Sequence, residues 1–383
     1  MTPTVALPDG PFTFSGSGGD HAAPGPPFRT RVAYAAAHVV ADPSAGNGPG
    51  APAVLDWEAT LRFRHHLWAH GFGVAEAMDT AQRGMGLDYP TARELIRRCA
   101  TEARAVGGRV VAGVATDQLP PGPASLGAIR DAYTEQLADV SAAGAVPVLM
   151  CSRQLAAVAS SADDYLELYS GLVVQSDQPV VLHWLGEAFD PALAGYWGDA
   201  EVGAAAGTLL ALIARHPGRI DGVKLSLLDA AFEVWFRRQL PAGVRMYTGD
   251  DFNYPELVRG DAVGYSDALL GVFAAIAPVA AAALRALDTG DTGVYDQLFA
   301  PTVPLARHLF GAPTYFYKTG IVFLAYLTGH QDHVTMVGGL QTGRSPRHLA
   351  HLIRLADAAG LLPDADLAAH RARAWLTTVG VPQ

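Results

Sequence analysis

The sequence predicts a (β/α)8 TIM barrel with a C-terminal helical extension. From Thr30 onward, eight short apolar runs alternate with longer segments of helical periodicity. The apolar runs show no strict alternation with polar residues, as is typical of strands buried on both faces of a parallel sheet. No glycine-rich dinucleotide fingerprint follows the first run, so an open, doubly wound sheet is the less favoured alternative.

The strands and helices follow from local signals taken in order. Several helices begin after a capping residue and end at a glycine, as the segments from Asp56 to Gly71 and from Asp88 to Gly107 show. The expected strands are residues 31–40, 73–78, 109–116, 146–151, 180–185, 220–226, 245–248 and 262–265. The expected barrel helices are residues 56–70, 88–106, 125–143, 163–174, 201–215, 230–240, 254–259 and 269–287.

Composition divides the chain into three segments. Residues 1–29 are rich in Gly, Pro and Ser, and we expect them to form an irregular N-terminal arm. Residues 30–290 hold the eight repeating units and form the predicted barrel. Residues 291–383 contain helical patterns at 294–310, 317–328, 346–360 and 364–377 without strands between them. We expect this region to pack on the barrel and to add contact surface for a homodimer or homotetramer.

Charge and composition exclude several partners. The net charge is −10 and no basic block occurs, which argues against nucleic acid or an acidic membrane surface. The apolar stretch 268–284 is mostly alanine, contains Gly271 and Pro278, and is shorter than the about 20 apolar residues of a membrane span. Cys99 and Cys151 do not suggest a disulfide framework. We expect a cytoplasmic protein that acts on a small molecule.

Lysine is scarce in this chain. Of 27 basic residues only Lys224 and Lys318 are lysines, although arginine cannot serve as an amine nucleophile. Lys224 lies inside an apolar strand, where desolvation would lower its pKa and leave a neutral amine. We predict a Schiff-base role for Lys224, with a structural ion pair to Asp250 as the alternative. Lys318 follows three aromatic residues, and we expect its aliphatic stem to pack on them.

Polar residues gather at the predicted ends of six strands, where active sites of such barrels lie. They are His38, Asp79, Asp117, His183, Lys224 and Asp250.

Three motifs around Lys224 resemble the dihydrodipicolinate synthase / N-acetylneuraminate lyase superfamily. They are Pro-Val-Val-Leu-His-Trp at 179–184, Asp-Gly-Val-Lys at 221–224 and Thr-Gly-Asp-Asp at 248–251. In that superfamily a lysine on strand six forms a Schiff base, and a turn similar to Gly249-Asp250 ends strand seven. The resemblance covers nearly all of residues 30–365 and identifies the chain as a divergent member of the superfamily.

Two departures from the superfamily pattern change the expected chemistry. His183 stands where the superfamily has a tyrosine that relays protons, and histidine also transfers protons near neutral pH. A core histidine bonded to a backbone carbonyl is the structural alternative. The stretch from Asp79 to Arg83 keeps only Thr80 of the motif that holds the carboxylate of pyruvate. The acidic Asp79 is expected to repel that carboxylate.

We therefore expect a class I aldolase-like lyase or hydratase that acts on a small keto acid or an oxidised sugar, without a cofactor or a metal. Lys224 would form the imine and His183 would move the proton. The expected substrate-binding residues are His38, Asp79, Thr80, Asp117, Trp184, Glu187, Gly249 and Asp250. For Asp117 and Asp250, loop capping is the alternative role, and for Trp184 and Glu187 it is packing.

Two other functions stay open. A metal-dependent sugar isomerase or epimerase would use five of these side chains as ligands to a divalent ion, namely His38, Asp79, Asp117, His183 and Asp250. A barrel that binds a ligand without catalysis would explain the lost strand-two motif.

Overall fold

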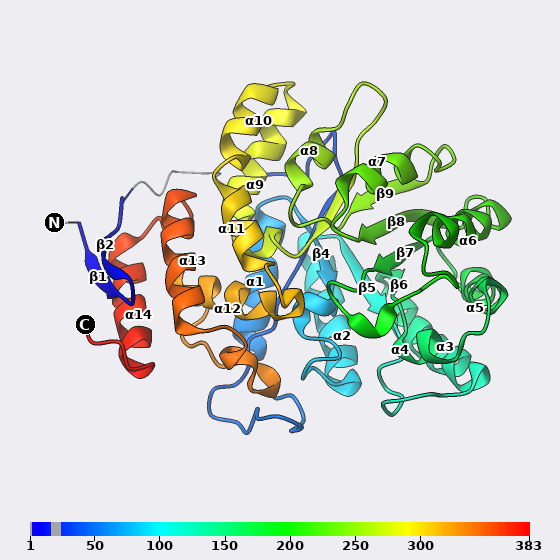
Figure 1. The fold of residues 1–383 in the computed structure, drawn as a ribbon, viewed down its shortest axis with the longest axis horizontal. Coiled ribbons are helices and arrows are strands. Elements are labelled where there is room, and N and C mark those ends of the chain that lie inside the picture. Colours follow the sequence, from blue (N-terminus) through cyan, green and yellow to red (C-terminus); the bar gives the residue numbers. More distant parts are fainter. Residues whose placement is uncertain (1, 17–23) are drawn as a thin grey trace.

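The computed structural model describes residues 2–16 and 24–383, and within them eight parallel strands close into a barrel (Figure 1). Each barrel strand pairs in parallel with both neighbours, and β10 closes the ring between β9 and β3. The barrel strands are β3 (Ala33–Ala36), β4 (Gly73–Glu76), β5 (Val110–Val114), β6 (Val146–Leu149), β7 (Val180–Leu185), β8 (Ile220–Ser226), β9 (Arg245–Thr248) and β10 (Asp267–Leu270). The predicted (β/α)8 barrel is confirmed.

Helices cover the outside of the barrel, and the first three begin where the sequence signals predict, whereas the short α4 was not predicted. The side chains of Asp56, Asp88 and Ser125 cap α1, α2 and α3 by accepting hydrogen bonds from backbone N–H groups of the first turn. The barrel helices are α1 (Trp57–Ala69), α2 (Tyr89–Val106), α3 (Leu126–Ala143), α4 (Arg153–Val158), α5 (Ala162–Gln175), α6 (Val202–Arg215), α7 (Ala230–Arg237), α8 (Tyr254–Arg259) and α9 (Phe273–Asp288).

The predicted eighth strand, residues 262–265, is wrong. These residues form a turn, because the Asp261 carboxylate accepts hydrogen bonds from the backbone N–H groups of Val263 and Gly264. The strand lies instead at Asp267–Leu270, and the closing helix begins at Phe273 rather than at residue 269. The segment from Asp267 is rich in alanine and leucine, which favour helices, so the sequence analysis assigned most of this strand to the helix that follows it.

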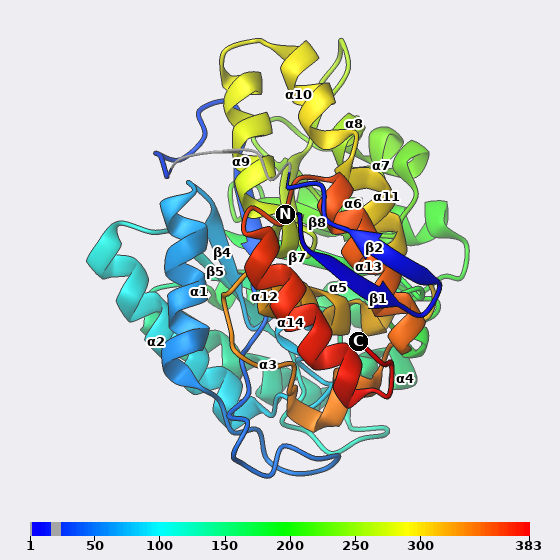
Figure 2. The ribbon, with the colours of Figure 1, turned by 90° about the vertical axis from the view of Figure 1, so that its left-hand side faces the viewer.

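The N-terminal arm is not wholly irregular. A hairpin of β1 (Thr4–Leu7) and β2 (Gly10–Thr13) lies across two C-terminal helices, α13 (Pro346–Ala358) and α14 (Ala365–Thr378) (Figure 2). The Arg373 guanidinium on α14 donates to Thr4 O, which ties the first strand to the last helix. Residues 1 and 17–23 of the expected arm lie outside the described residues.

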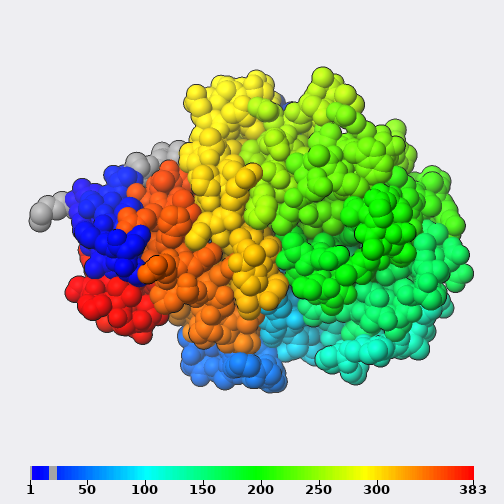
Figure 3. Space-filling model, viewed as in Figure 1, coloured from blue at the N-terminus to red at the C-terminus, as the bar shows by residue number. Residues whose placement is uncertain are grey.

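The C-terminal region lies side by side with the barrel (Figure 3). The single helix expected at 294–310 is two helices, α10 (Thr292–Phe299) and α11 (Thr302–Leu309), which separate at Pro301. Every residue of the next helix, α12 (Tyr317–Leu327), is buried. Across the described residues, no helix combines the length and the apolarity that crossing a bilayer requires.

A buried ion pair fixes the end of β4, from which the chain enters the barrel mouth. Arg64 on α1 donates to both carboxylate oxygens of Glu76 at 2.8 and 2.9 Å, and both side chains are fully buried. The same carboxylate accepts from the N–H of Ala77, whose φ is 48°. The left-handed conformation of a non-glycine residue is uncommon and costs energy, so the ion pair holds a strained turn just before Asp79.

We expect Glu76→Gln to lower the free energy of unfolding by about 3–5 kcal/mol, because the Arg64 guanidinium would stay buried without its counter-charge. Urea denaturation measures this change. The double variant Arg64→Met/Glu76→Gln is the control and should lose less than Glu76→Gln alone. A single-variant loss below about 1 kcal/mol would contradict this role.

Candidate active site

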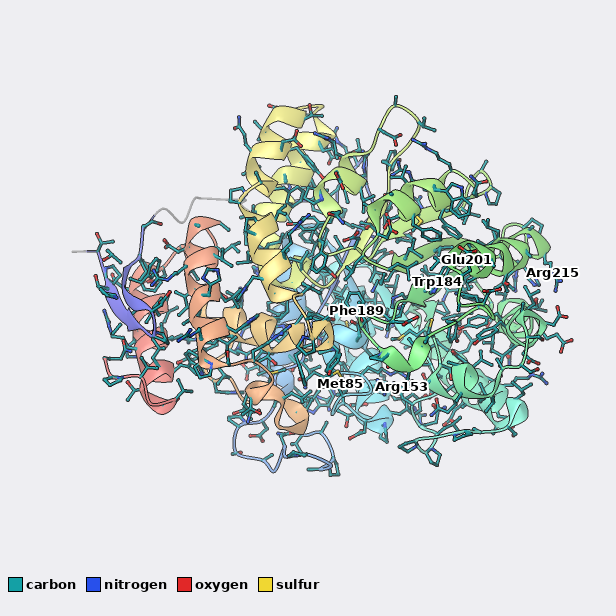
Figure 4. All side chains as sticks on the ribbon, viewed as in Figure 1. Met85, Arg153, Trp184, Phe189, Glu201 and Arg215 are labelled. Carbon is teal, nitrogen blue, oxygen red and sulfur yellow. The ribbon has the colours of Figure 1, made fainter. Side chains whose placement is uncertain are left out.

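A cavity of about 360 Å³ opens at the carboxyl ends of β4 to β7. Asp79, Thr116, Cys151 and Leu185 line it from the barrel, and Lys318 lines it from α12. Such a volume and position are typical of the ligand sites of TIM barrels. In Figure 4, the labelled side chains Met85, Arg153 and Phe189, all of which line the cavity, gather near the barrel end of α12.

Lys224 is a buried amine without an ion-pair partner. It lies on β8, is 5 % exposed, and forms no hydrogen bond or salt bridge with any described residue. Burial lowers its pKa below the ordinary 10.5, and the carboxylates of Asp79 and Asp251 oppose that shift through space. The structural alternative, an ion pair between Lys224 and Asp250, is not formed.

Gly249 leaves room for the Lys224 side chain. A Cβ at this position would lie 3.0 Å from Lys224 Cε, 2.8 Å from the backbone oxygen of Leu225 and 2.1 Å from Ser226 Oγ. Any larger residue would therefore displace the lysine or separate β8 from β9. Gly249 thus has a steric role beside Lys224, whatever its contact with a ligand.

The two aspartates after Gly249 have different roles. Asp250 caps the following turn, because its carboxylate accepts from the N–H groups of Phe252 and Asn253 and from the Asn253 side chain. Asp251 lies near Lys224, accepts from Val272 N at 2.8 Å, and has a pKa that burial raises well above its usual range. Asp251, which the sequence analysis did not select, is the aspartate of this turn that acts on the lysine.

Both lysines of the chain act electrostatically on Asp79. Burial alone would raise its pKa, but the positive charges of Lys224 and Lys318 outweigh burial and lower the pKa to about 2. Tyr317 on α12 donates its hydroxyl to Asp79 Oδ2 at 2.6 Å and lies 2.7 Å from Thr80 Oγ1. Asp79 therefore carries a full negative charge next to a buried amine.

His183 is the neighbour of Lys224 in the register of β7 and β8. Its ring is fully buried, with Nε2 at 3.2 Å from Ser226 Oγ and with no partner for Nδ1 among the described residues. Burial and the charge of Lys224 lower its pKa well below the usual range, so the imidazole is neutral. The alternative of a histidine whose ring bonds a backbone carbonyl is not found; the His183 carbonyl instead accepts from Cys151 Sγ at 3.2 Å.

Asp117 lines the cavity in a fixed ion pair. Arg83 donates to both of its carboxylate oxygens at 2.9 and 2.7 Å, and Gln136 donates to Oδ1 at 2.9 Å. The side chain keeps 18 % of its surface exposed. Both expected roles are thus compatible with its position: it shapes the wall and presents an oxygen to the cavity.

Of the expected site residues, Asp79 and Asp117 line the cavity, whereas Lys224 and His183 lie on β8 and β7 and are not part of its lining. Three other expected binding residues do not line the cavity either. His38 is buried against Phe63 and bonds Gln331 at 2.9 Å, at the contact between barrel and C-terminal region. Trp184 follows the inward-pointing His183, so it points outward and packs against Phe232 and Phe236 of α7 (Figure 4). Glu187 is exposed and does not line the cavity.

The ligand set of the metal-dependent alternative is not assembled. His38 is engaged with Gln331, Asp117 with Arg83, and Asp250 with its own turn. Throughout the described part of the chain, His, Cys, Asp and Glu side chains form no group of three or more suited to hold a metal ion.

Sequence analysis missed Tyr317 and assigned Lys318 only its packing on aromatic residues. Lys318 does lie over an aromatic ring, 4.8 Å from the Tyr317 centroid, but its ammonium is buried at the cavity wall. The scarcity of lysine was the one signal available, and it applied equally to Lys318 and Lys224. The position of Lys318 in the helical tail concealed it, because nothing local shows that α12 returns to the barrel mouth.

The fold is a TIM barrel similar to that of the dihydrodipicolinate synthases. The 4-hydroxy-tetrahydrodipicolinate synthase from Methylacidiphilum fumariolicum SolV superposes with a TM-score of 0.65 at 15 % identity, over 88 % of this chain and 99 % of that chain. The dihydrodipicolinate synthase from Aquifex aeolicus gives 0.64 at 13 % identity, over 87 % and 99 %. The chloride-inhibited enzyme from Acinetobacter baumannii, complexed with pyruvate, gives 0.63 at 15 % identity, over 87 % and 100 %.

At these identities the likeness establishes the fold, and it confirms the resemblance predicted from the three motifs at that level. No curated protein sequence matches the chain. The chain belongs to the family described as "Protein of unknown function (DUF993)", whose family model matches residues 13–381.

Because the chain has two lysines, ¹³Cε-lysine labelling yields two resolved titration curves. We expect Lys318 to titrate near pH 8 and Lys224 below its ordinary pKa of 10.5. Asp79→Asn should lower both values further, because it removes the negative charge that favours both ammonium forms. The exposed Glu187→Gln serves as the control and should move neither. A Lys224 pKa at or above 10.5 would contradict the effect of burial on this amine.

Proposed function

We propose that this protein is a class I aldolase-like lyase or hydratase that forms a Schiff base between Lys224 and the carbonyl group of a small keto acid or an oxidised sugar. The single observation that carries the proposal is the environment of Lys224: a buried amine without an ion pair or hydrogen bond to any described residue, on the strand next to that of His183. A structural ammonium at such depth needs hydrogen bonds or a bonded counter-charge, since an unpaired buried ammonium is costly. A nucleophilic lysine instead requires an environment that favours the neutral amine, without a bonded counter-charge.

The proposed chemistry begins when Lys224 gives up its proton, a loss that burial favours, and its Nζ attacks the carbonyl carbon. The carbinolamine hydroxyl takes up a proton and leaves as water, which gives a positively charged iminium ion. In a lyase reaction, the neighbouring C–C bond breaks, its electron pair moves toward the iminium nitrogen, and the departing fragment loses its hydroxyl proton as its carbonyl forms; protonation of the resulting enamine carbon and hydrolysis of the iminium then release the product. In a hydratase reaction, loss of a proton from the carbon next to the iminium gives the enamine, which expels the protonated β-hydroxyl group as water, and hydrolysis of the unsaturated iminium restores the amine.

Two side chains support these steps. The carboxylate of Asp79 carries the negative charge that stabilises an iminium on Lys224, and Tyr317 keeps that carboxylate in place. The neutral imidazole of His183 has a free Nδ1, so it can accept a proton at the carbon next to the imine and return it. The pyruvate-bound Acinetobacter structure supports a keto acid as one substrate class, because its fold is shared.

Borohydride reduction in the presence of the substrate should attach one substrate skeleton to Lys224. Mass spectrometry then needs only to distinguish an adduct on Lys224 from an adduct on Lys318, since the chain has two lysines. Lys224→Arg keeps the charge but cannot form an imine, so it should give no adduct and no turnover. Lys318→Arg is the matched control and should still form the adduct at residue 224. An adduct on Lys318, or turnover by Lys224→Arg, would overturn the proposal.

His183→Gln should separate imine formation from proton transfer. Glutamine keeps a hydrogen-bonding group near Ser226 but cannot exchange a proton, so trapping at Lys224 should change little. Exchange of substrate protons with deuterated solvent next to the carbonyl should slow by about 10²–10⁴-fold. The exchange is followed by proton NMR, and an unchanged rate would remove His183 from the mechanism.

A further inference from the structure

We propose that Lys318 is the anion-binding residue of the cavity, and that it binds a singly charged carboxylate of the ligand. The binding group thus comes from α12, outside the (β/α)8 barrel. The identification of this ligand as the substrate rests on the proposed function, whereas the anion site itself does not.

The charges around the cavity single out Lys318. Three cationic side chains line it, and two of them are neutralised. Arg83 forms its two-point ion pair with Asp117, and Arg153 Nε lies 2.5 Å from Asp190 Oδ2. Lys318 has no carboxylate within ion-pair distance in the described parts of the chain. Lys318 is therefore the lining cation that remains available to an anion.

The hydrogen bonds of Lys318 leave one donor unused. Its Nζ donates to Tyr315 O at 3.1 Å and to Met85 Sδ at 3.3 Å. Both acceptors are neutral, and an ammonium group has three N–H bonds. Because Lys318 lines the cavity, a ligand bound there can offer an oxygen atom to the remaining N–H.

Because Lys318 is buried, its unused N–H donor costs free energy. Lys318 is 3 % exposed, and a charged group at that depth is stabilised only by a counter-charge or by full hydrogen bonding. Burial lowers its pKa to about 8, against the opposing effect of Asp79, so most of the ammonium stays charged at pH 7. A bound carboxylate would supply the missing counter-charge and raise the pKa again.

The nearby Asp79 determines which anion fits. Asp79 is held ionised and also lines the cavity, so the local potential combines one positive and one negative lining group. One ammonium group offsets one negative charge, so Asp79 would repel the second charge of a dianion such as phosphate. A monoanion with a polar, uncharged remainder places its carboxylate at Lys318 and its carbonyl or hydroxyl groups toward Asp79, next to Lys224.

The arrangement also accounts for the altered strand-two loop. With Asp79 at the end of β4, that loop cannot accept an acid group, and sequence analysis expected it to repel one. Lys318 offers a different place for the acid. Lys318 and Asp79 both line the cavity, whose volume of about 360 Å³ has room for a small ligand that contacts both.

The test uses ¹³Cε-lysine spectra of the full chain, titrated with pyruvate, 2-oxoglutarate, inorganic phosphate and the neutral analogue hydroxyacetone. In Lys224→Met, which cannot form an imine, the monoanion pyruvate should still shift the Lys318 signal and raise its pKa, whereas 2-oxoglutarate and phosphate, which carry a second negative charge, should bind more weakly. Lys318→Met should weaken 2-oxo acid binding at least tenfold and leave hydroxyacetone unaffected, whereas Lys318→Arg should retain most of the binding.

The outcomes separate the two proposals. Acid binding at Lys318 without any borohydride adduct on Lys224 supports the anion site and overturns the Schiff-base function. A Lys318 signal that no 2-oxo acid moves, or equal binding by Lys318→Met, overturns the anion site whatever happens at Lys224. If Lys318→Met does not fold, the pKa change of Lys318 in Lys224→Met decides alone: a rise on binding supports the site, and no rise overturns it.

Discussion

The negative charge of Asp79 is the constraint on which the rest of the site depends. One carboxylate faces both lysines of the chain, and the hydroxyl of Tyr317 holds it at 2.6 Å. Burial alone would drive each amine toward the neutral form. Asp79 opposes that effect through space at both lysines, and the two differ in their direct contacts: Lys318 donates to Tyr315 O and Met85 Sδ, whereas Lys224 has no hydrogen bond to any described residue.

The position of Asp79 in turn depends on elements far apart in the sequence. The Arg64–Glu76 ion pair fixes the end of β4, and the strained Ala77 starts the turn that carries Asp79 into the cavity. From the other side, the wholly buried α12 supplies Tyr317. The C-terminal region is therefore part of the site rather than an accessory layer, and the barrel alone would lack half of the groups that act on Asp79.

The sequence predicted those features that hydrophobic periodicity and the scarcity of lysine reveal. Apolar runs located seven of the eight strands, and the rarity of lysine singled out Lys224 before any fold was known. The errors have a common cause: a position at a strand end does not reveal the direction of its side chain. Trp184 points outward because His183 points inward, and Asp250 caps a turn while Asp251 faces the lysine. Tyr317 depends on a long-range contact that no local pattern contains.

The acidic Asp79 has a consistent electrostatic consequence. It stands in the stretch that the sequence analysis compared with the superfamily motif that holds a carboxylate, and its negative charge disfavours an acid there. In the proposed mechanism the same charge stabilises the positive iminium on Lys224. A single loop cannot do both, because the two charges have opposite sign. Acid binding by Lys318, as we propose it, would leave Asp79 to favour the iminium, so the helix outside the barrel and the loop inside it would act together.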